Sequence, residues 1–284
     1  MSIIHAIVLG IIQGLTEFLP VSSSGHLVLF QKIFGISEAA LLFDTMLHVG
    51  TLAAVVAVLW KDIWAILRKL NQPLTAYLII ATVPTVIAAL VFRKPLERAF
   101  ETGHFLGFAF LVTSALLAVA ELLARRGAVK SSTAKSKSPT ALRLSLKLPD
   151  ALVIGVMQAI AIIPGISRSG ATLSGALSRR LDRDLAARFS FLLSIPAILG
   201  AVVFQLKDLV KGDEAEAVGS VTAPDGIGTA AMIAGTLSAA IVGFFAVRLM
   251  LKIVREKSLW GFAIYTGVLG ALVLLDQFAL RLVF

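Results

Sequence analysis

The pattern of apolar and polar positions divides the chain into long apolar segments separated by short polar ones. Six segments come close to the ~20 residues that a helix needs to cross a bilayer. They span 41–59, 74–92, 104–124, 189–206, 230–251 and 259–282. The strands of a membrane β-barrel would instead alternate over ~10-residue segments, which the chain does not show. The sequence therefore predicts an all-α integral membrane protein with six transmembrane helices.

Two shorter apolar segments, 3–19 and 151–163, each run into a break rich in proline, serine and glycine. The first break lies in the stretch QGLTEFLPVSSSGHL, which places a carboxylate and an imidazole within an apolar run. A charged side chain at membrane depth costs at least ~2.5–3.5 kcal/mol and usually marks a functional site. Interrupted segments at matching places in two halves are typical of a site near the membrane midplane. We therefore expect two re-entrant helical hairpins, over 3–36 and 151–181.

The two breaks resemble each other at a constant offset. The matched residues are polar or glycine: Gly10 with Gly155, Gln13 with Gln158, Ser22 with Ser167, Ser24 with Ser169 and Gly25 with Gly170. Each half then contains one hairpin and three crossings, and an odd number of crossings inverts the second half relative to the first. The sequence predicts an inverted-topology repeat. Its first half spans 1–129, a linker spans 130–148, and its second half spans 149–284.

The basic residues indicate the orientation in the membrane. They concentrate in four predicted loops, at 60–73, 125–148, 179–188 and 252–258. These loops share one side only if 151–181 enters and leaves by the same face. Because basic loops stay in the cytoplasm, this side is cytoplasmic, and the 3–36 hairpin enters from the outer side. Within 179–188, the cluster of Arg179, Arg180 and Arg183 is expected to be a cytoplasmic anchor.

The distribution of basic residues also indicates which kinds of partner the protein binds. The net charge of +9 comes from these loops, so it indicates membrane lipids and not nucleic acid. The polar segment 130–140 is typical of a flexible linker, with binding of anionic headgroups as the alternative. The chain has no cysteine, which excludes disulfides, thiolate nucleophiles and cysteine–metal sites.

The polar residues of the two breaks form a candidate site where the hairpin tips meet. The first tip supplies Glu17, Ser22, Ser23, Ser24 and His26, and the second supplies Ser167, Arg168, Ser169 and Thr172. Arg168 offers the planar donor fork that binds phosphate or carboxylate. A helix that begins near Ser169 would add a favourable dipole for an anion. A carboxylate, hydroxyls and an imidazole beside this arginine suit phosphoryl transfer, with or without a divalent ion.

Simpler interpretations stay open for the same residues. Glu17 and Arg168 can form a buried structural ion pair, and serines in membrane helices often bond only to backbone. A lone histidine such as His26 is more often a packed polar residue. Asp44 and His48, one turn apart, either support the site or simply face the bundle. The coincidence of these groups at equivalent places of a repeat favours the functional interpretation.

At these residues the sequence resembles the undecaprenyl-diphosphate phosphatases of the bacitracin-resistance protein type. The stretch from Gln13 to His26 is similar to the family's Glu/Gln-x-x-x-Glu motif and its following serine, glycine and histidine segment. Pro164 to Thr172 is similar to its Pro-Gly-x-Ser-Arg-Ser-x-x-Thr motif. The resemblance implies hydrolysis of undecaprenyl diphosphate to undecaprenyl phosphate and phosphate, which recycles the lipid carrier of cell-wall synthesis and confers bacitracin resistance. It also implies a bacterial cytoplasmic (inner) membrane and a site open to the periplasmic side.

The resemblance also implies roles for individual residues. It makes Glu17 the essential carboxylate, Ser23 the proposed nucleophile, His26 an acid/base or alternative nucleophile, and Arg168 the phosphate clamp. The residues expected to contact substrate are Gln13, Ser22, Ser24, Ser167, Ser169 and Thr172. Attack by a water activated at Glu17 stays open. The implied cofactor is Mg²⁺ or Ca²⁺, with Glu17 as its candidate ligand, because Gln13 stands where some relatives have Glu and carries no charge.

Two further questions stay open at the level of sequence. Inverted repeats with re-entrant tips are typical of transporters, so an inverted-repeat transporter or lipid-phosphate flippase is the alternative function. The oligomeric state, a homodimer included, and the preferred metal are also undecided.

Overall fold

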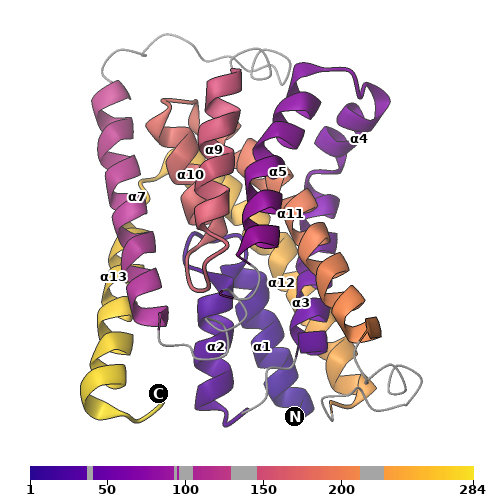
Figure 1. Ribbon diagram of the computed structural model, residues 1–284, viewed down its shortest axis with the longest axis vertical. Coiled ribbons are helices and arrows are strands. Elements are labelled where there is room, and N and C mark those ends of the chain that lie inside the picture. The colour runs from indigo at the N-terminus through magenta and orange to yellow at the C-terminus, as the bar shows by residue number, and fades with distance from the viewer. Residues whose placement is uncertain (37–40, 93–94, 96–104, 129–145, 212–226) are drawn as a thin grey trace.

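The protein is a bundle of α-helices, shown as a computed structural model in Figure 1. The structure describes residues 1–36, 41–92, 95, 105–128, 146–211 and 227–284. In chain order its elements are α1 (Ile3–Thr16), α2 (Ser23–Ile33), α3 (Leu41–Val58), α4 (Trp60–Arg68), α5 (Pro73–Val91), α7 (Leu106–Ala128), α9 (Leu148–Ile160), α10 (Arg168–Ser178), α11 (Arg183–Lys211), α12 (Thr229–Glu256), α13 (Trp260–Leu275) and a π-helical turn (Asp276–Leu280). Over these described residues the all-α prediction is confirmed.

Long apolar helices lie where the sequence predicts spans. Within the described residues, α5, α7, α11, α12 and α13 are long and apolar enough to cross a membrane. A sixth candidate consists of α3 and α4 taken together, with a bend of 76° between them. Many large apolar side chains on these helices are exposed, as expected for surfaces that face lipid. The chain is a multi-pass membrane protein.

The sequence-based interpretation of 60–73 as a loop is wrong for its first part, which forms the short helix α4. Trp60, Ile63, Trp64 and Leu67 have the helical i, i+3, i+4, i+7 spacing, and this signal could have revealed the helix. None of the residues of α4 is buried. The rings of Trp60 and Trp64 stack on its exposed side, with centroids 5.7 Å apart. This helix is amphipathic and bends by 76° from α3.

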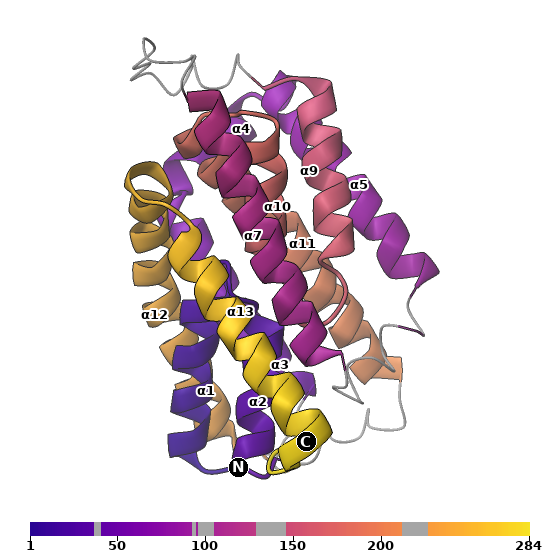
Figure 2. The same ribbon diagram turned by 90° about the vertical axis from the view of Figure 1, so that its left-hand side faces the viewer.

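Two pairs of short helices occupy opposite ends of the bundle and reach its middle (Figures 1 and 2). One end holds α1 and α2, the other holds α9 and α10, and the turns within the pairs meet between them. Direct hydrogen bonds join the two turns: the N–H of Gly165 donates to Ser24 Oγ (3.3 Å), and Ser169 Oγ donates to the carbonyl O of Leu19 (3.0 Å). The two polar breaks of the sequence therefore come together in space.

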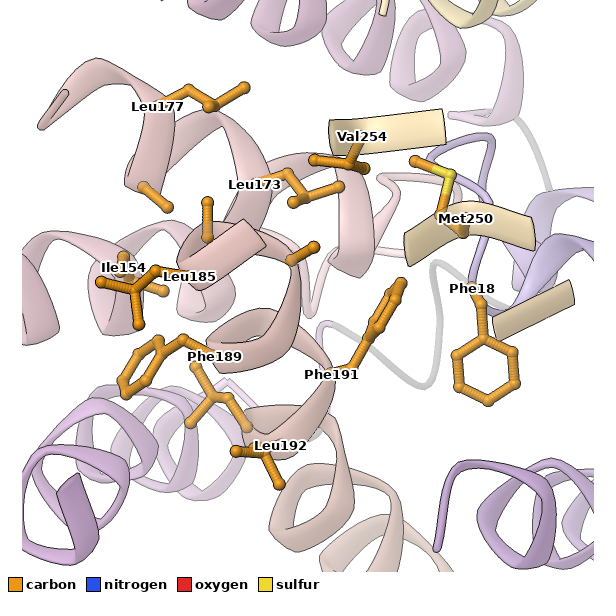
Figure 3. Packing of buried hydrophobic residues seen from close by; sticks show 14 of the residues in the cluster. Phe18, Ile154, Leu173, Leu177, Leu185, Phe189, Phe191, Leu192, Met250 and Val254 are labelled. Atoms are coloured by element: carbon orange, nitrogen blue, oxygen red, sulfur yellow. The ribbon is translucent and has the colours of Figure 1, made fainter. Parts of the chain in front are cut away.

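The second pair packs into the largest group of buried apolar side chains (Figure 3). Leu173 of α10 and Phe191 of α11 lie in this cluster, and Phe18 joins it from the first turn. Phe18 meets the ring of Phe191 edge-to-face, with centroids 5.8 Å apart. The first turn is thus held by a hydrophobic side chain next to its polar ones.

Glycines allow the backbones of two helix pairs to approach closely. A Cβ added to Gly14 of α1 would lie 2.8 Å from the carbonyl O of Ala239 on α12. A Cβ on Gly155 of α9 would lie 2.6 Å from the carbonyl O of Ala81 on α5. Such contacts matter in lipid, where burial from water does not drive helix association and van der Waals packing takes its place.

Ion pairs link the helices at the end of the bundle that holds α4. Glu121 is 2% exposed and accepts hydrogen bonds from Arg183 Nη2 at both oxygens, each 2.9 Å long. Arg179 pairs with Asp150 at 2.8 Å. Two of the arginines that the sequence predicts as an anchor therefore also form ion pairs between helices. The sequence alone did not reveal these ion pairs.

Candidate functional site

Glu17 lies at the centre of the site, where α1 ends before Pro20. Its side chain is only 5% exposed. The Oε1 atom accepts from Arg168 Nη2 at 2.6 Å, and Oε2 accepts from Ser23 Oγ at 2.5 Å and Gln13 Nε2 at 3.0 Å. Three elements, α1, α2 and α10, therefore supply donors to one carboxylate. The structure brings together Glu17, Ser23, Arg168 and Gln13 from the predicted set.

Two helices begin at this carboxylate. Ser23 is the first residue of α2, and Arg168 is the first residue of α10. Each helix has a serine N-cap: Ser22 Oγ accepts from the N–H of Gly25 at 3.2 Å, and Ser167 Oγ accepts from the N–H of Gly170 at 3.1 Å. The N-terminal ends of α2 and α10 direct their partial positive charge at the same point, which favours an anion there.

Arg168 is held between two partners. Its Nη1 donates to the carbonyl O of Ser194 on α11 at 3.1 Å, while Nη2 bonds to Glu17. The buried ion pair that the sequence left as an alternative is thus present. The ion pair alone does not explain why the Ser23 hydroxyl also bonds to this carboxylate. A hydroxyl bonded to a carboxylate is the arrangement of a nucleophile beside its base.

Ser22 has a strained backbone at the site. Its φ angle is 73°, in a region that residues with a Cβ rarely adopt. Such an angle costs roughly 1–3 kcal/mol, and it persists only where surrounding bonds hold it. Since Ser22 directly precedes Ser23, the strained residue sets where the Ser23 hydroxyl points.

His26 is bonded away from Ser23 and Glu17. Its Nδ1–H donates to the carbonyl O of Ser22 at 2.7 Å, and its Nε2 lies 2.7 Å from the hydroxyl of Tyr265. The imidazole is 3% exposed and stacks on the Tyr265 ring. The structure therefore separates His26 from the other residues for which the sequence predicts catalytic roles.

The remaining predicted contacts hold the two turns in place. Ser24 and Ser169 join one turn to the other, as described above. The N–H of Ser167 donates to Thr113 Oγ1 of α7 at 3.0 Å. Thr172 is buried, and its hydroxyl bonds to the carbonyl O of Arg168 and to Ser190 Oγ on α11. These hydroxyls bond to backbone and to neighbouring helices, which is the simpler role that the sequence left open for serines.

The two residues that the sequence left undecided lie next to the site. His48 Nε2 is 3.9 Å from Glu17 Oε2. The other ring nitrogen of His48 donates to the carbonyl O of Asp44 at 2.7 Å, and the Asp44 carboxylate accepts from Gln31 Nε2 at 2.8 Å. His48 therefore faces the central carboxylate, and Asp44 connects it to α2.

Few side chains of the site could act as ligands of a metal ion. Gln13 Oε1 is buried and has no hydrogen-bond partner, so it offers a second hard oxygen beside Glu17. Within the described ranges, no group of three or more His, Asp or Glu residues could hold a metal ion. The residues fit a divalent cation only if ligands from outside the protein, such as phosphate oxygens, complete its coordination.

Sequence reasoning missed Tyr265, Thr113 and the carbonyl of Ser194, which bond to His26, Ser167 and Arg168. Tyr265 carried a weak signal, because it is one of only two tyrosines and lies inside an apolar segment. The carbonyl of Ser194 carried no signal in the sequence, because every residue has a backbone carbonyl.

The fold and the site define a multi-pass membrane protein with a buried polar centre between two helical turns. The family model of the bacitracin resistance protein BacA matches residues 6–272, so the chain belongs to this family. An undecaprenyl-diphosphatase of Carboxydothermus hydrogenoformans is 44% identical over 98% of this chain and 99% of its own. Undecaprenyl-diphosphatase 4 of Bacillus thuringiensis subsp. konkukian and undecaprenyl-diphosphatase 3 of Bacillus cereus are each 42% identical over 98% of both chains.

Proposed function

We propose that this protein hydrolyses undecaprenyl diphosphate to undecaprenyl phosphate and inorganic phosphate, and that this reaction confers bacitracin resistance. The relatives named undecaprenyl-diphosphatase align with this chain over almost their whole length. The observation that carries the proposal in the structure is the Ser23 hydroxyl, which donates to Glu17 Oε2 at 2.5 Å while Arg168 bonds to Oε1. A hydroxyl, a base and a fixed positive charge are the groups that phosphoryl transfer requires.

The geometry supports a two-step reaction with Ser23 as the nucleophile. As the Oγ–P bond to the terminal phosphorus forms, Glu17 takes the Ser23 proton and passes it to the departing undecaprenyl phosphate as the anhydride bond breaks. Water then attacks the phosphoserine and gives a proton to Glu17. The Oγ–P bond breaks, Glu17 returns this proton to Ser23 Oγ, and phosphate leaves. Arg168 and the N-terminal ends of α2 and α10 stabilise the charge that develops on the phosphate oxygens.

A divalent ion, Mg²⁺ or Ca²⁺, is the proposed cofactor. Its support is the unpartnered Gln13 Oε1 beside the Glu17 carboxylate, together with the phosphate oxygens of the substrate. Bound there, the ion would supply positive charge to the diphosphate. Chelation of divalent ions is expected to abolish hydrolysis, and titration of Mg²⁺ against Ca²⁺ would show which ion restores it.

We also propose how the chain lies in the bacterial cytoplasmic membrane. The pairs α1–α2 and α9–α10 would be re-entrant hairpins from opposite faces, within inverted halves at 1–129 and 149–284. Support comes from their positions at opposite ends of the bundle and from the basic residues near α4. With its tryptophans in the headgroup layer, α4 would lie along the cytoplasmic surface. The site would then open to the periplasmic side.

The absence of cysteine makes this topology directly testable. Single Ser2→Cys and Lys69→Cys variants would be treated in intact cells with a membrane-impermeant maleimide. The topology predicts that the cysteine at position 2 is labelled from outside and the one at position 69 only after permeabilisation. The reverse pattern would invert the proposed orientation.

The decisive assay for the enzyme uses purified protein, undecaprenyl diphosphate and a divalent ion. Phosphate release is expected from the wild type and from Lys252→Ala, which removes an exposed basic residue far from the site. It is expected to fall to background in Glu17→Ala and Arg168→Ala. A folded wild type that releases no phosphate would exclude the activity.

The opposed helix pairs α1–α2 and α9–α10 favour one further candidate, flipping of a lipid phosphate across the membrane. Proteoliposomes that hold a fluorescent polyprenyl phosphate would report it as dye that becomes accessible from the other leaflet. Flipping without hydrolysis would support the transporter, whereas hydrolysis without flipping would support the phosphatase alone.

A further inference from the structure

A chain of hydrogen bonds runs from α13 to the residue that precedes Ser23. The Tyr265 hydroxyl lies 2.7 Å from His26 Nε2, and His26 Nδ1 lies 2.7 Å from the carbonyl O of Ser22. We propose that Tyr265 and His26 are positioning residues that hold Ser22, and through it the Ser23 hydroxyl, in the reactive geometry. This inference rests on the proposed phosphatase activity, and it assigns His26 a role other than acid or base.

The partners of His26 determine its tautomer. A carbonyl oxygen only accepts hydrogen bonds, so the Nδ1 that faces Ser22 carries the proton. In the neutral imidazole Nε2 is then unprotonated and accepts from the Tyr265 O–H. Both nitrogens are occupied, and neither is bonded to Ser23 or Glu17. In this arrangement His26 has no free nitrogen with which to take a proton from a nucleophile.

Two aromatic rings fix the plane of the imidazole. The Tyr265 ring stacks on it, with centroids 5.7 Å apart and an interplanar angle of 12°. The Phe110 ring of α7 meets it edge-on at 5.4 Å. Since Phe110 is fully buried, His26 is clamped between α7 and α13. The imidazole can therefore transmit the position of these two long helices to the start of α2.

Ser22 is a residue that needs such support. Its φ of 73° is unfavourable for a residue with a Cβ, and relaxation to a negative φ would rotate the following peptide. Ser23 is attached to that peptide, and its hydroxyl bonds to Glu17 at 2.5 Å. Small displacements of a reacting group have large effects on rate, because catalysis depends on a near-attack geometry. A bond that prevents this relaxation acts on the rate without touching the substrate.

Tyr265 differs from a tyrosine that anchors a helix at the membrane surface. The residue is 47% exposed, but its hydroxyl bonds inward to a buried histidine. Interfacial tyrosines instead place the hydroxyl among lipid headgroups. The hydroxyl of Tyr265 thus forms a hydrogen bond inside the protein. Removal of this hydroxyl would leave the stacked ring in place.

The test compares variants that separate positioning from proton transfer. His26→Asn keeps an N–H that can donate to Ser22 but removes every acid/base function, whereas His26→Ala removes both. Tyr265→Phe keeps the ring and removes the hydroxyl, and Tyr77→Phe on α5 is the matched control, since these are the two tyrosines of the chain. The kcat and KM for undecaprenyl diphosphate would be measured for each purified protein.

The proposal predicts that His26→Asn keeps kcat within about tenfold of wild type, while His26→Ala loses about a hundredfold or more. Tyr265→Phe should lower kcat about tenfold with KM unchanged, and Tyr77→Phe should change neither. Equal inactivation of His26→Asn and His26→Ala would show an acid/base role and overturn the proposal. A Tyr265→Phe protein with the activity of Tyr77→Phe would also overturn it. If His26→Ala does not fold, the Asn and Phe variants still decide.

A second measurement does not depend on activity. Nitrogen-15 NMR of histidine-labelled wild type should show His26 protonated at Nδ1 and unprotonated at Nε2, with the Nε2 signal shifted in Tyr265→Phe but not in Tyr77→Phe. Protonation at Nε2 alone would overturn the bond chain. A wild type that hydrolyses nothing but shows this signature would refute the proposed function while supporting the geometry.

Discussion

Ser23 and Arg168, each the first residue of its helix, donate to different oxygens of the same Glu17 carboxylate. The two residues occupy aligned positions in the two similar breaks of the sequence, but one supplies a hydroxyl and the other a fixed charge. The same structural position therefore carries complementary chemistry in each half. This relationship explains why neither break alone contains a complete site.

Replacement of Ser23 distinguishes attack on phosphorus by Ser23 from attack by water. If Ser23 attacks phosphorus, Ser23→Ala should lower kcat by about 10⁴ or more, because the covalent route is lost. Rapid quenching with radiolabelled substrate should also trap a phosphoserine in the wild type. Residual hydrolysis by Ser23→Ala within about a hundredfold of wild type, with no trapped phosphoserine, would indicate direct attack by water held at Glu17.

Arg168 should not tolerate lysine. A lysine keeps the charge but cannot bond at once to Glu17, to the Ser194 carbonyl and to a phosphate, as the guanidinium fork can. Arg168→Lys is expected to lower kcat/KM by about 10²–10³, the usual effect of losing a preorganised donor. Steady-state kinetics would check this, with Lys252→Arg as the exposed control. Near-normal kinetics would mean that charge alone is needed.

Close packing of α9 against α5 should depend on Gly155. Valine there would place its Cβ 2.6 Å from the Ala81 carbonyl O, so the helices must move apart, at a cost of about 1–3 kcal/mol. A Cβ added to Gly200 would meet no atom within 4 Å. Thermal unfolding in detergent should therefore show a clear drop in Tm for Gly155→Val and little change for Gly200→Val. Equal Tm values would contradict the packing.

Glu121 should contribute to stability and not to catalysis. It is buried and bonded to Arg183 and to the N–H of Leu259, neither of which belongs to the residues around Glu17. Removing one partner of a buried pair leaves the other unpaired, so Glu121→Ala should cost about 3 kcal/mol. We expect a lower Tm but an unchanged kcat per folded molecule at 25 °C. Loss of kcat in fully folded protein would indicate coupling to the site.

Much of the architecture could be predicted because its causes are local. Apolar runs long enough to span a bilayer become helices, since lipid offers no partner for free backbone groups. Proline and serine in the two breaks end one helix and cap the next, as Pro20 and Ser22 do. The sequence placed Glu17 and Arg168 at the two facing breaks and offered their pairing as an alternative, which the structure shows to be present. The helix α4 was missed because its charges obscured a short amphipathic period.

The sequence by itself determined the long apolar helices, the two polar interruptions and the kinds of chemical group that these interruptions carry. Only the tertiary structure decided which groups meet, because hydrogen bonds depend on distances of a few tenths of an ångström between residues far apart in the chain. It placed Ser23, and not His26, on the Glu17 carboxylate, and it gave His26 a partner in Tyr265, 239 positions away. No local pattern encodes that contact, since it arises where side chains of α2 and α13 meet in the apolar cluster around Phe110 of α7.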